Sequence, residues 1–168
     1  RAVSSRLGIP CVPAHHMEGH LLSMFLDRPR GAPEADCPAL VLLVTGGHTA
    51  LMRMDAPGRY DVLGRSIDDA AGEALDKGAR LLDLPYPGGP EIERLAREGT
   101  LDPDRFPRGL PSGEEAKRRG GTFPFSFSGL KTSLRYFLEA HPAADRADVA
   151  CSYQHAVMDT LLRRVERA

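Results

Sequence analysis

The sequence predicts a mixed α/β chain, in which a small antiparallel sheet is followed by several helices. The apolar run 39–44, Ala-Leu-Val-Leu-Leu-Val, has the length and composition of a strand covered on both faces. Stretches 66–82 and 148–168 carry apolar residues at helical spacing. With 168 residues, of which 42% are hydrophobic and 27% charged, the chain suits one globular domain or part of a larger one.

Charge and cysteine content narrow the classes of function. The formal net charge is −1, from 22 basic and 23 acidic residues, so a nucleic-acid partner would need a local basic patch. The cysteines Cys11, Cys37 and Cys151 are odd in number and widely spaced, which excludes a Cys-x-x-Cys metal knuckle and argues against a disulfide framework. The longest apolar run, 39–44, is too short to cross a bilayer. We therefore expect a cytoplasmic protein with no membrane partner.

The N-terminal part, 1–38, is expected to hold two helical segments and a linker. Residues 1–7, followed by Gly8 and Pro10, have the pattern of the last turns of a helix, and 9–13 that of a strand edge or connector. A helix is predicted from about Ala14 to Phe25, and the proline-rich stretch 27–38 is a linker or lobe boundary. Because the chain starts with Arg1 and its last helical stripe reaches the terminus without a stop signal, we expect an internal fragment.

The sheet is predicted to be a hairpin with a glycine tip, followed by a third strand. The tip 45–47, Thr-Gly-Gly, interrupts the first apolar run, strand 48–54 follows, and 60–63 is a further short strand. Helix 66–82 would begin with a capping-box-like pair, Ser66 and Asp69. Pro90 would stand in the first turn of a second helix, which ends near Gly99.

The remaining stretch alternates between loop and regular structure. Residues 100–121 are rich in proline, glycine and charge, and are predicted to form an inserted, flexible segment. Residues 123–128, Phe-Pro-Phe-Ser-Phe-Ser, alternate like a strand. A helix is then predicted from Gly129 to about Ala140, before the final helix 148–168.

His16 and His20 are the clearest candidate metal ligands. Because they are one helical turn apart, their side chains point within about 40° of each other and can share one ion. Glu18 falls on another side of the helix and is better placed to orient a ligand. Zinc peptidases place the glutamate directly after the first histidine, so the order His-x-Glu-x-His disfavours peptide hydrolysis. A chance pair of surface histidines is the alternative.

Glycines and one carboxylate are candidates for binding a nucleotide. The backbone N–H groups of Gly46-Gly47 can approach a phosphate closely, although a tight turn also explains two adjacent glycines. Asp76 can accept two hydroxyl hydrogen bonds from a ribose, or it belongs to a solvated acidic face with a Glu73–Lys77 pair. Gly89 would let a base or sugar lie against the backbone, or it simply forms the turn before a helix.

Five sequence blocks occur in a fixed order along the chain. They are His-Met-Glu-Gly-His at 16–20, Leu-Val-Thr-Gly-Gly-His-Thr at 43–49, Ser-Ile-Asp-Asp-Ala-Ala-Gly-Glu-Ala at 66–74, Tyr-Pro-Gly-Gly-Pro at 86–90 and Phe-Ser-Phe-Ser-Gly-Leu-Lys-Thr at 125–132. Together they closely resemble the bacterial TsaD family, the threonylcarbamoyl transferases of tRNA that were formerly named O-sialoglycoprotein endopeptidases. The resemblance covers nearly the whole chain and is far more specific than any one pattern.

The resemblance implies a two-lobed, actin-like ATPase (ribonuclease H-like) fold, present here only in part. Residues 1–38 would end the first lobe and 39–168 would begin the second, with the flexible insertion near 100–121. The implied reaction moves the threonylcarbamoyl group from threonylcarbamoyl-adenylate to N6 of the adenosine 3′ of the anticodon, in tRNAs that read codons beginning with A. This reaction would make the full-length parent an acyltransferase of tRNA modification.

The resemblance also implies roles for individual residues. His16 and His20 match the family's ligands for one divalent metal ion per subunit, with iron preferred over zinc. The substrate-binding hairpin and nucleotide contacts are matched by Leu43, Val44, Thr45, Gly46, Gly47, Asp76 and Gly89. No catalytic side chain is assigned.

The implied partners are tRNA, a TsaB-like protein and a TsaE-like ATPase. The basic runs 117–119 and 163–164 are candidates for phosphate contacts, or are ordinary solvated surface. The family's aspartate metal ligand and its first phosphate-binding lobe match nothing in this chain, so we expect the fragment alone to be inactive. The alternative functions are a metallopeptidase and a non-catalytic nucleotide-binding module of the same fold.

Overall fold

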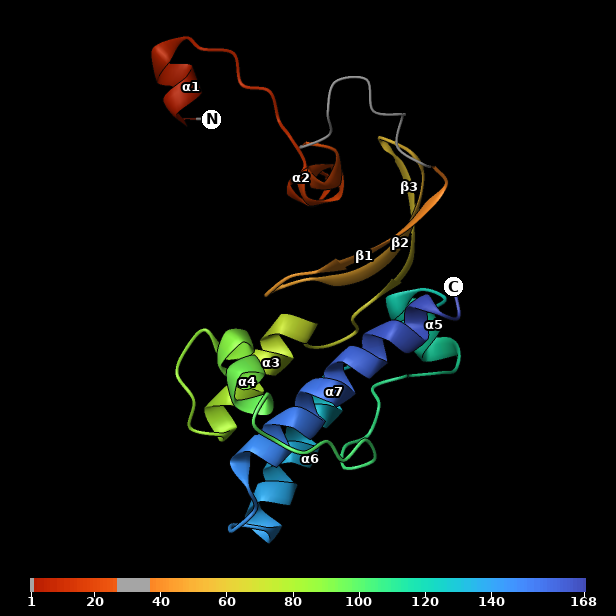
Figure 1. Cartoon of the computed structure of the whole chain (residues 1–168). Helices are drawn as coiled ribbons and strands as arrows, with labels where there is room; N and C mark the ends of the chain where they lie inside the picture. Colours follow the sequence, from red (N-terminus) through yellow and green to blue (C-terminus); the bar gives the residue numbers. More distant parts are fainter. Residues whose placement is uncertain (1, 27–36) are drawn as a thin grey trace.

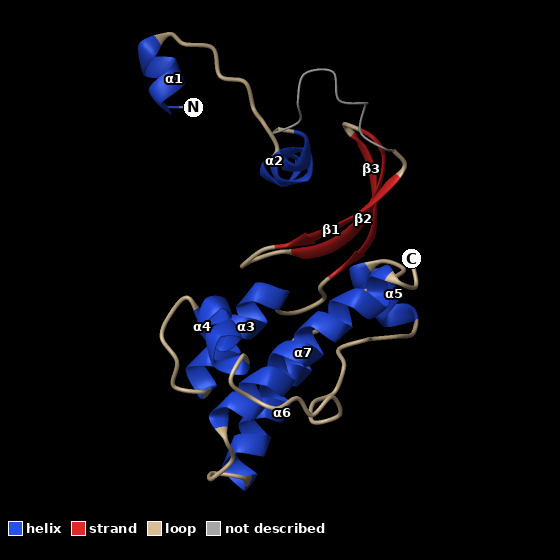
Figure 2. Cartoon of the chain, viewed as in Figure 1, coloured by secondary structure: helices blue, strands red, loops and turns tan. Residues whose placement is uncertain are grey.

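The structure, a computed structural model, describes residues 2–26 and 37–168, and its sheet and helical parts are shown in Figures 1 and 2. The N-terminal part holds helices α1 (Ala2–Leu7) and α2 (His16–Leu22) and the 3₁₀ helix η1 (Ser23–Phe25). The strands are β1 (Ala39–Val44), β2 (Thr49–Ala56) and β3 (Arg59–Arg65). The helices that follow are α3 (Ala71–Leu81), α4 (Gly88–Ala96), α5 (Glu114–Gly120), α6 (Ser128–Ala140) and α7 (Arg146–Val165).

The three strands form an antiparallel sheet in sequence order, β1-β2-β3. Leu42 pairs with Leu51 in the middle of the first hairpin, and Val44 pairs with Thr49 at its end. The predicted strand 39–44 and the glycine tip are therefore confirmed. The second and third strands are also confirmed, although β2 and β3 extend beyond the predicted ends at 54 and 63.

The sheet separates two apolar clusters. One face packs on Leu21 of α2, and the other packs on the helices that follow. Side chains of β1 alternate between the clusters, so that Leu42 faces the helices while its two neighbours face α2. The strand is covered on both faces at its centre, as predicted, whereas Leu40 and Val44 near its ends are each 42% exposed.

Helices α3, α4, α6 and α7 pack together on the side of the sheet opposite α2 (Figure 1). Tyr153 of α7 is fully buried, and its hydroxyl donates to the Ala74 carbonyl oxygen of α3 at 2.9 Å. Gly78 permits this contact, because a Cβ there would lie 2.3 Å from the Tyr153 Cε1 atom. At Gly99 a Cβ would lie 2.1 Å from the Ala147 carbonyl oxygen, so glycine also lets the chain after α4 approach α7.

The predicted helix 66–82 begins at Ala71 instead, so the prediction is wrong at its start. The Ser66 hydroxyl donates to the Asp69 carbonyl oxygen at 2.6 Å rather than forming a capping box. Thr49 of β2 supplies the cap, because its Oγ1 accepts the Ala71 N–H at 2.9 Å. A cap from another element leaves no local signal in the sequence.

The predicted strand 123–128 is wrong as a regular strand. This stretch forms one isolated bridge, between Phe125 and Ser66 just after β3, and Gly121 shortly before it forms another with Gly64 of β3. Helix α6 follows at Ser128 and ends at Ala140, which confirms the predicted helix. The alternating Phe and Ser residues therefore line an extended connection along the edge of β3.

Residues 100–121, predicted as a flexible insertion, contain α5 and make several contacts with α7. Phe106 is 2% exposed within the larger apolar cluster. The guanidinium of Arg108 forms an ion pair with Asp159 and donates to the carbonyl oxygens of Pro103 and Phe106, each at 2.6 Å. Burial raises the pKa of Asp159, but the bonds from Arg108 and Arg163 outweigh it and lower the pKa.

The other predicted elements have shifted ends. Helix α1 confirms the helical stretch 1–7, and α2 and η1 lie within the predicted helix 14–25. The helices predicted around Pro90 and at 148–168 are confirmed as α4 and α7. The predicted linker 27–38 falls almost entirely outside the described residues, and the division at residue 38 stays a prediction. Within the described ranges, no helix is long and apolar enough to span a membrane.

Candidate functional site

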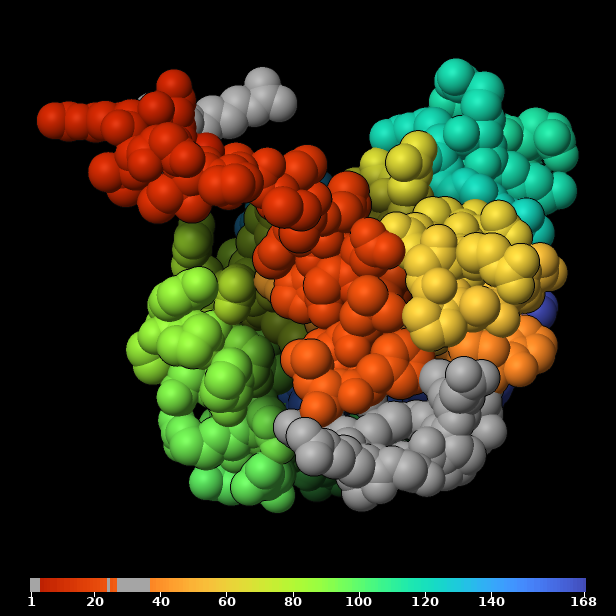
Figure 3. Space-filling model, turned by 90° about the horizontal axis from the view of Figure 1, so that it is seen from above, coloured from red at the N-terminus to blue at the C-terminus, as the bar shows by residue number. Residues whose placement is uncertain are grey.

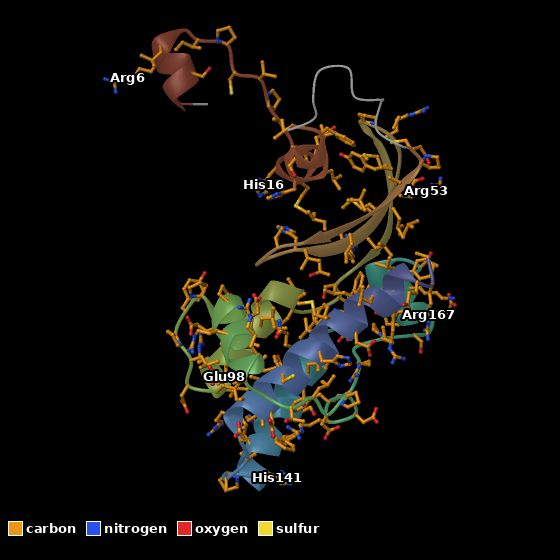
Figure 4. All side chains as sticks on the ribbon, in the orientation of Figure 1. Arg6, His16, Arg53, Glu98, His141 and Arg167 are labelled. Carbon is orange, nitrogen blue, oxygen red and sulfur yellow. The ribbon has the colours of Figure 1, made fainter. Side chains whose placement is uncertain are left out.

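Helix α2 carries the two candidate metal ligands, His16 and His20. Met17 and Leu21 of the same helix pack toward the sheet, while both imidazoles are exposed. The two Nε2 atoms lie 3.1 Å apart, and the ring centroids are 4.5 Å apart. Figure 4 shows His16 projecting from α2 on the same side of the molecule as the glycine tip of the hairpin. The structure therefore brings the two predicted ligands together.

The distance between the two nitrogens suits a shared metal ion. Two nitrogens about 2.1 Å from one ion lie about 3.0 Å apart at a right angle and about 3.4 Å apart at a tetrahedral angle. The observed 3.1 Å falls within that range. In the described part of the chain, however, no three His, Cys, Asp or Glu side chains form a metal-binding group. Glu18 lies toward the β2–β3 turn, with its Oε1 atom 4.0 Å from an ideal Cβ at Gly58.

The glycine tip between β1 and β2 is open on one side and packed against α3 on the other. Thr45 N–H donates to the His48 carbonyl oxygen at 2.8 Å, and Thr45 Oγ1 accepts the His48 N–H at 3.0 Å. A Cβ at Gly46 or Gly47 would meet no atom within 4 Å. A Cβ at Gly72, in contrast, would lie 2.8 Å from the Thr45 carbonyl oxygen. The tip is thereby held at the first turn of α3.

The two other predicted hairpin residues, Leu43 and Val44, face opposite sides of the sheet. Leu43 is 8% exposed and belongs to the cluster beneath α2, whereas Val44 is 42% exposed. Of these two residues, only Val44 therefore exposes its side chain to solvent, and Leu43 packs beneath α2.

Asp76 of α3 faces the start of α4. Its Oδ1 atom accepts the Gly88 N–H at 2.8 Å, and both residues line a cavity of 290 Å³ together with Lys77 and Arg80. A Cβ at Gly88 would lie 2.7 Å from the Asp76 Cα, whereas the atom nearest to a Cβ at Gly89 would be Leu75 Cδ1, at 3.9 Å. The structure therefore places the predicted contacts Asp76 and Gly89 at the same helix start.

Lys77 connects α3 to the segment that precedes it. Its Nζ lies 2.6 Å from Asp69 Oδ1 and 2.8 Å from Glu73 Oε1, so the predicted Glu73–Lys77 pair is confirmed and Asp69 joins it. Hydrogen bonds to Asp69 and Glu73 raise the pKa of Lys77, and the bond to Lys77 lowers the pKa of Glu73. Lys77 and Glu73 are therefore both charged at neutral pH.

A groove of 530 Å³ runs beside the hairpin tip, between α2, strands β2 and β3, and α5. Figure 3 views the molecule from the α2 side, with α5 in cyan beyond the yellow strand residues. The polar lining consists of His48, Thr49, Arg65, Ser66, Asp68, Lys117 and Arg118. From the sequence, the basic run 117–119 is a candidate for phosphate contacts, but no role is assigned to Arg65, which belongs to no local pattern, or to Asp68, although Asp68 lies in the sequence block 66–74.

Asp68 ties this groove to the start of α6. Its Oδ1 atom accepts the N–H groups of Phe127 at 2.8 Å and Ser128 at 3.3 Å. Its Oδ2 atom accepts the hydroxyls of Ser126 and Ser128. Burial raises the pKa of Asp68, but these hydrogen bonds outweigh it and lower the pKa. Asp68 is therefore an ionised structural acceptor and is poorly suited to remove a proton.

Sheet, hairpin and helices together form a mixed α/β unit that is part of an actin-like ATPase fold. The family model of TsaD, described as tRNA N6-adenosine threonylcarbamoyltransferase, matches residues 1–168. The chain belongs to this family, whose members are transferases that modify tRNA. The predicted fold and family are thereby confirmed.

Three similar proteins are each named tRNA N6-adenosine threonylcarbamoyltransferase. The protein of Chlorobaculum tepidum is 47% identical over 163 residues, covering 94% of this chain and 46% of the relative. The Geotalea uraniireducens protein is 46% identical, covering 100% and 47%, and the Bordetella petrii protein is 48% identical, covering 96% and 45%. The chain spans about half the length of the curated relatives it matches.

Proposed function

We propose that the full-length protein transfers the threonylcarbamoyl group from threonylcarbamoyl-adenylate to N6 of the adenosine 3′ of the anticodon, in tRNAs that read codons beginning with A. The observation that carries this proposal is the match of the TsaD family model over residues 1–168. A metallopeptidase is disfavoured because Glu18 lies toward the β2–β3 turn and does not follow His16 directly.

His16 and His20 are proposed to hold one divalent metal ion, iron in preference to zinc. Their 3.1 Å separation and two imidazole donors fit either metal, with a further ligand from outside the described residues. When bound, the metal supplies Lewis-acid polarisation of the carbamoyl or carboxylate oxygen of the donor. The packing of Leu21 sets the position of α2, the helix that carries both imidazoles, relative to the sheet.

The hairpin tip and the start of α4 are proposed to bind the donor nucleotide. Gly46 and Gly47 are exposed, and their N–H groups are proposed to bind phosphate oxygens, while the open space at Gly89 would admit the sugar or base. Asp76 already uses Oδ1 to accept the Gly88 N–H. Its Oδ2 atom is therefore the acceptor proposed for a ribose hydroxyl. Asp76 would then bind the start of α4 through one oxygen and the nucleotide through the other.

The proposed transfer forms one bond and breaks one. The N6 nitrogen of the adenosine attacks the carbamoyl carbon, and the bond from that carbon to the phosphate oxygen breaks. AMP leaves with the electron pair of that bond, and the proton lost from N6 passes to water. The lowered pKa of Asp68 disfavours this residue as the base, and no other side chain is assigned that role.

The proposed partners are tRNA, a TsaB-like protein and a TsaE-like ATPase, and the proposed location is the cytoplasm. Support for tRNA comes from the family and from the names of the similar proteins. The two partner proteins are supported by the sequence resemblance alone, and the location by the odd number and wide spacing of the cysteines.

The test combines the full-length protein with its partner proteins, threonylcarbamoyl-adenylate and unmodified tRNA. The RNA is then digested and its nucleosides are analysed by mass spectrometry. We expect threonylcarbamoyladenosine from the wild type and from His141→Ala, since His141 lies at the far end of α6 (Figure 4), and none from His16→Ala. Product from His16→Ala would contradict the metal assignment. A wild type that binds AMP but forms no product would favour a nucleotide-binding module.

A further inference from the structure

We propose that the 530 Å³ groove beside the hairpin tip receives a nucleotide of the tRNA, the acceptor of the transferred group. Its base would lie against the apolar wall of the groove, and its phosphate would contact Arg65, Lys117 and Arg118. This inference rests on the proposed function and deepens it, because it assigns a place to the acceptor rather than to the donor.

The position of the groove suits an acceptor site. The groove includes Gly47 and His48 of the hairpin tip and Met17 of α2, the neighbour of His16. It shares no lining residue with the 290 Å³ cavity at Asp76, where the donor nucleotide is proposed to bind. Group transfer requires both substrates to meet at the reacting carbon. The hairpin tip lines the groove and also packs on Gly72 of α3, one turn before Asp76, so a donor held at α3 and an acceptor in the groove would approach the tip from different sides.

The wall of the groove has an apolar part that a base can cover. Met17, Ala50, Met52 and Val62 form this part, and Val62 is 52% exposed although it lies in a strand. Enzymes that modify a base hold it against aromatic or apolar side chains, since stacking does not depend on the sequence around it. A volume of 530 Å³ is also within the usual range of about 300–1,000 Å³ for small-ligand sites.

The charges on the groove favour an anionic partner. Among the described residues that line the groove, Asp68 is the only carboxylate, and both of its oxygens already accept bonds from the start of α6. Arg65 forms no ion pair with a described residue, and its Nε donates to the Arg119 carbonyl oxygen at 3.0 Å. Together Arg65, Lys117 and Arg118 form one basic edge of the groove, here called the basic rim, in which Arg65 has no carboxylate partner among the described residues.

The ion pairs of α5 are weak enough to yield to phosphate. Lys117 lies 3.4 Å from Glu114, and Arg118 lies 2.8 Å from Glu115. The two glutamate side chains are 93% and 66% exposed, and exposed pairs of this kind contribute about 0–1 kcal/mol. A phosphate on the rim can replace the glutamates as the partner of both cations.

Close backbone contacts hold α5 at the edge of the sheet. A Cβ at Gly120 would lie 2.9 Å from the Arg65 carbonyl oxygen, and one at Gly121 would lie 2.7 Å from the Leu63 carbonyl oxygen. The Arg119 guanidinium donates to the Ile67 carbonyl oxygen at 2.8 Å. The basic rim is therefore fixed before a ligand arrives, which lowers the entropy lost on binding.

The test measures binding of unmodified tRNA to the full-length protein at several salt concentrations. For the double variant Lys117→Ala/Arg118→Ala, we expect the Kd to rise about tenfold and the logarithmic salt slope to fall by about 1.4, which corresponds to two lost single-strand phosphate contacts. Arg135→Ala is the matched control, because Arg135 of α6 is also exposed and paired with a glutamate. The control should leave the Kd unchanged, and AMP affinity should be unchanged in both variants.

Two further variants test whether glutamates compete with phosphate for the basic side chains, and whether a base packs on the apolar wall of the groove. Glu114→Gln/Glu115→Gln removes the competing carboxylates and should lower the Kd for tRNA about threefold, opposite in sign to the first variant. Val62→Glu places a charge on an exposed part of the wall and should raise the KM for tRNA about tenfold, with the KM for threonylcarbamoyl-adenylate unchanged.

The outcomes separate this inference from the proposed function. If the wild type forms no threonylcarbamoyladenosine, the proposed function fails and the groove loses its proposed ligand. If the wild type forms product but the Lys117→Ala/Arg118→Ala variant binds tRNA normally, only the groove assignment is overturned. An equal loss of tRNA affinity in Arg135→Ala would also overturn the groove assignment, because the effect would then reflect the net charge of the protein rather than this rim.

Discussion

Replacing Asp68 with alanine removes the carboxylate that holds the start of α6. The N–H groups of Phe127 and Ser128 lose their acceptor, and so do the hydroxyls of Ser126 and Ser128. Loss of a capping side chain costs about 0.5–2 kcal/mol, and loss of a hydrogen bond to a charged group costs about 1.5–3 kcal/mol. Because the site is open to water, which replaces part of these bonds, we expect the free energy of unfolding to fall by about 2 kcal/mol.

The lowered pKa of Asp68 makes this contribution depend on pH. A carboxylate whose pKa is lower in the folded state contributes stability above its unfolded pKa, here 3.8, and loses it as the pH falls through the folded pKa. The difference in unfolding free energy between wild type and Asp68→Ala should therefore be complete above about pH 5 and shrink below about pH 4.

The assay is urea unfolding followed by far-ultraviolet circular dichroism, at neutral pH and at about pH 3. Asp61→Ala is the control, because the Asp61 side chain is 67% exposed and its salt bridge within the described part of the chain is to Arg53, itself exposed. We expect the control to change the free energy of unfolding by less than about 0.5 kcal/mol. The reasoning is refuted if Asp68→Ala loses no more stability than Asp61→Ala, or if its loss is the same at both pH values.

Two other substitutions test packing around the hairpin and between helices. In Gly72→Ala, a Cβ 2.8 Å from the Thr45 carbonyl oxygen must displace the hairpin tip, so we expect AMP affinity by titration calorimetry to fall about tenfold. Wild-type affinity would show that the tip does not bind the nucleotide. Tyr153→Phe removes the bond to the Ala74 carbonyl oxygen and should lower the free energy of unfolding by about 1 kcal/mol in urea. No measurable change would show that this buried bond contributes nothing net.

Features set by neighbouring residues were predictable from the sequence. The apolar run 39–44 and the glycines after it specify the first hairpin, because strand formation and turn geometry are both local. The approach of His16 to His20 follows from helical spacing alone, since residues one turn apart share a face. The pair Glu73 and Lys77 was predictable for the same reason.

Contacts between distant segments account for the errors. Helix α3 starts at Ala71 because Thr49, 22 residues earlier, accepts its first N–H. The groove depends on Gly64, where a Cβ would lie 1.9 Å from the Phe123 carbonyl oxygen, so the chain after α5 can lie directly on β3. The sequence does not indicate which distant backbone segment will pack against a glycine. The residues around Arg65 therefore do not predict that it lies beside Lys117 and Arg118.

The site is positioned mainly by backbone and short side chains rather than by long flexible ones. Thr49 and Gly72 fix the hairpin tip on α3, Asp68 fixes the segment before α3 on α6, and Gly120 fixes α5 on β3. These contacts allow little adjustment, because a carbonyl oxygen cannot move aside as a flexible side chain does. Small substitutions at these positions should therefore alter the relative placement of the two proposed substrate spaces. We infer that ligand affinity responds to such changes more strongly than the stability of the apolar core does.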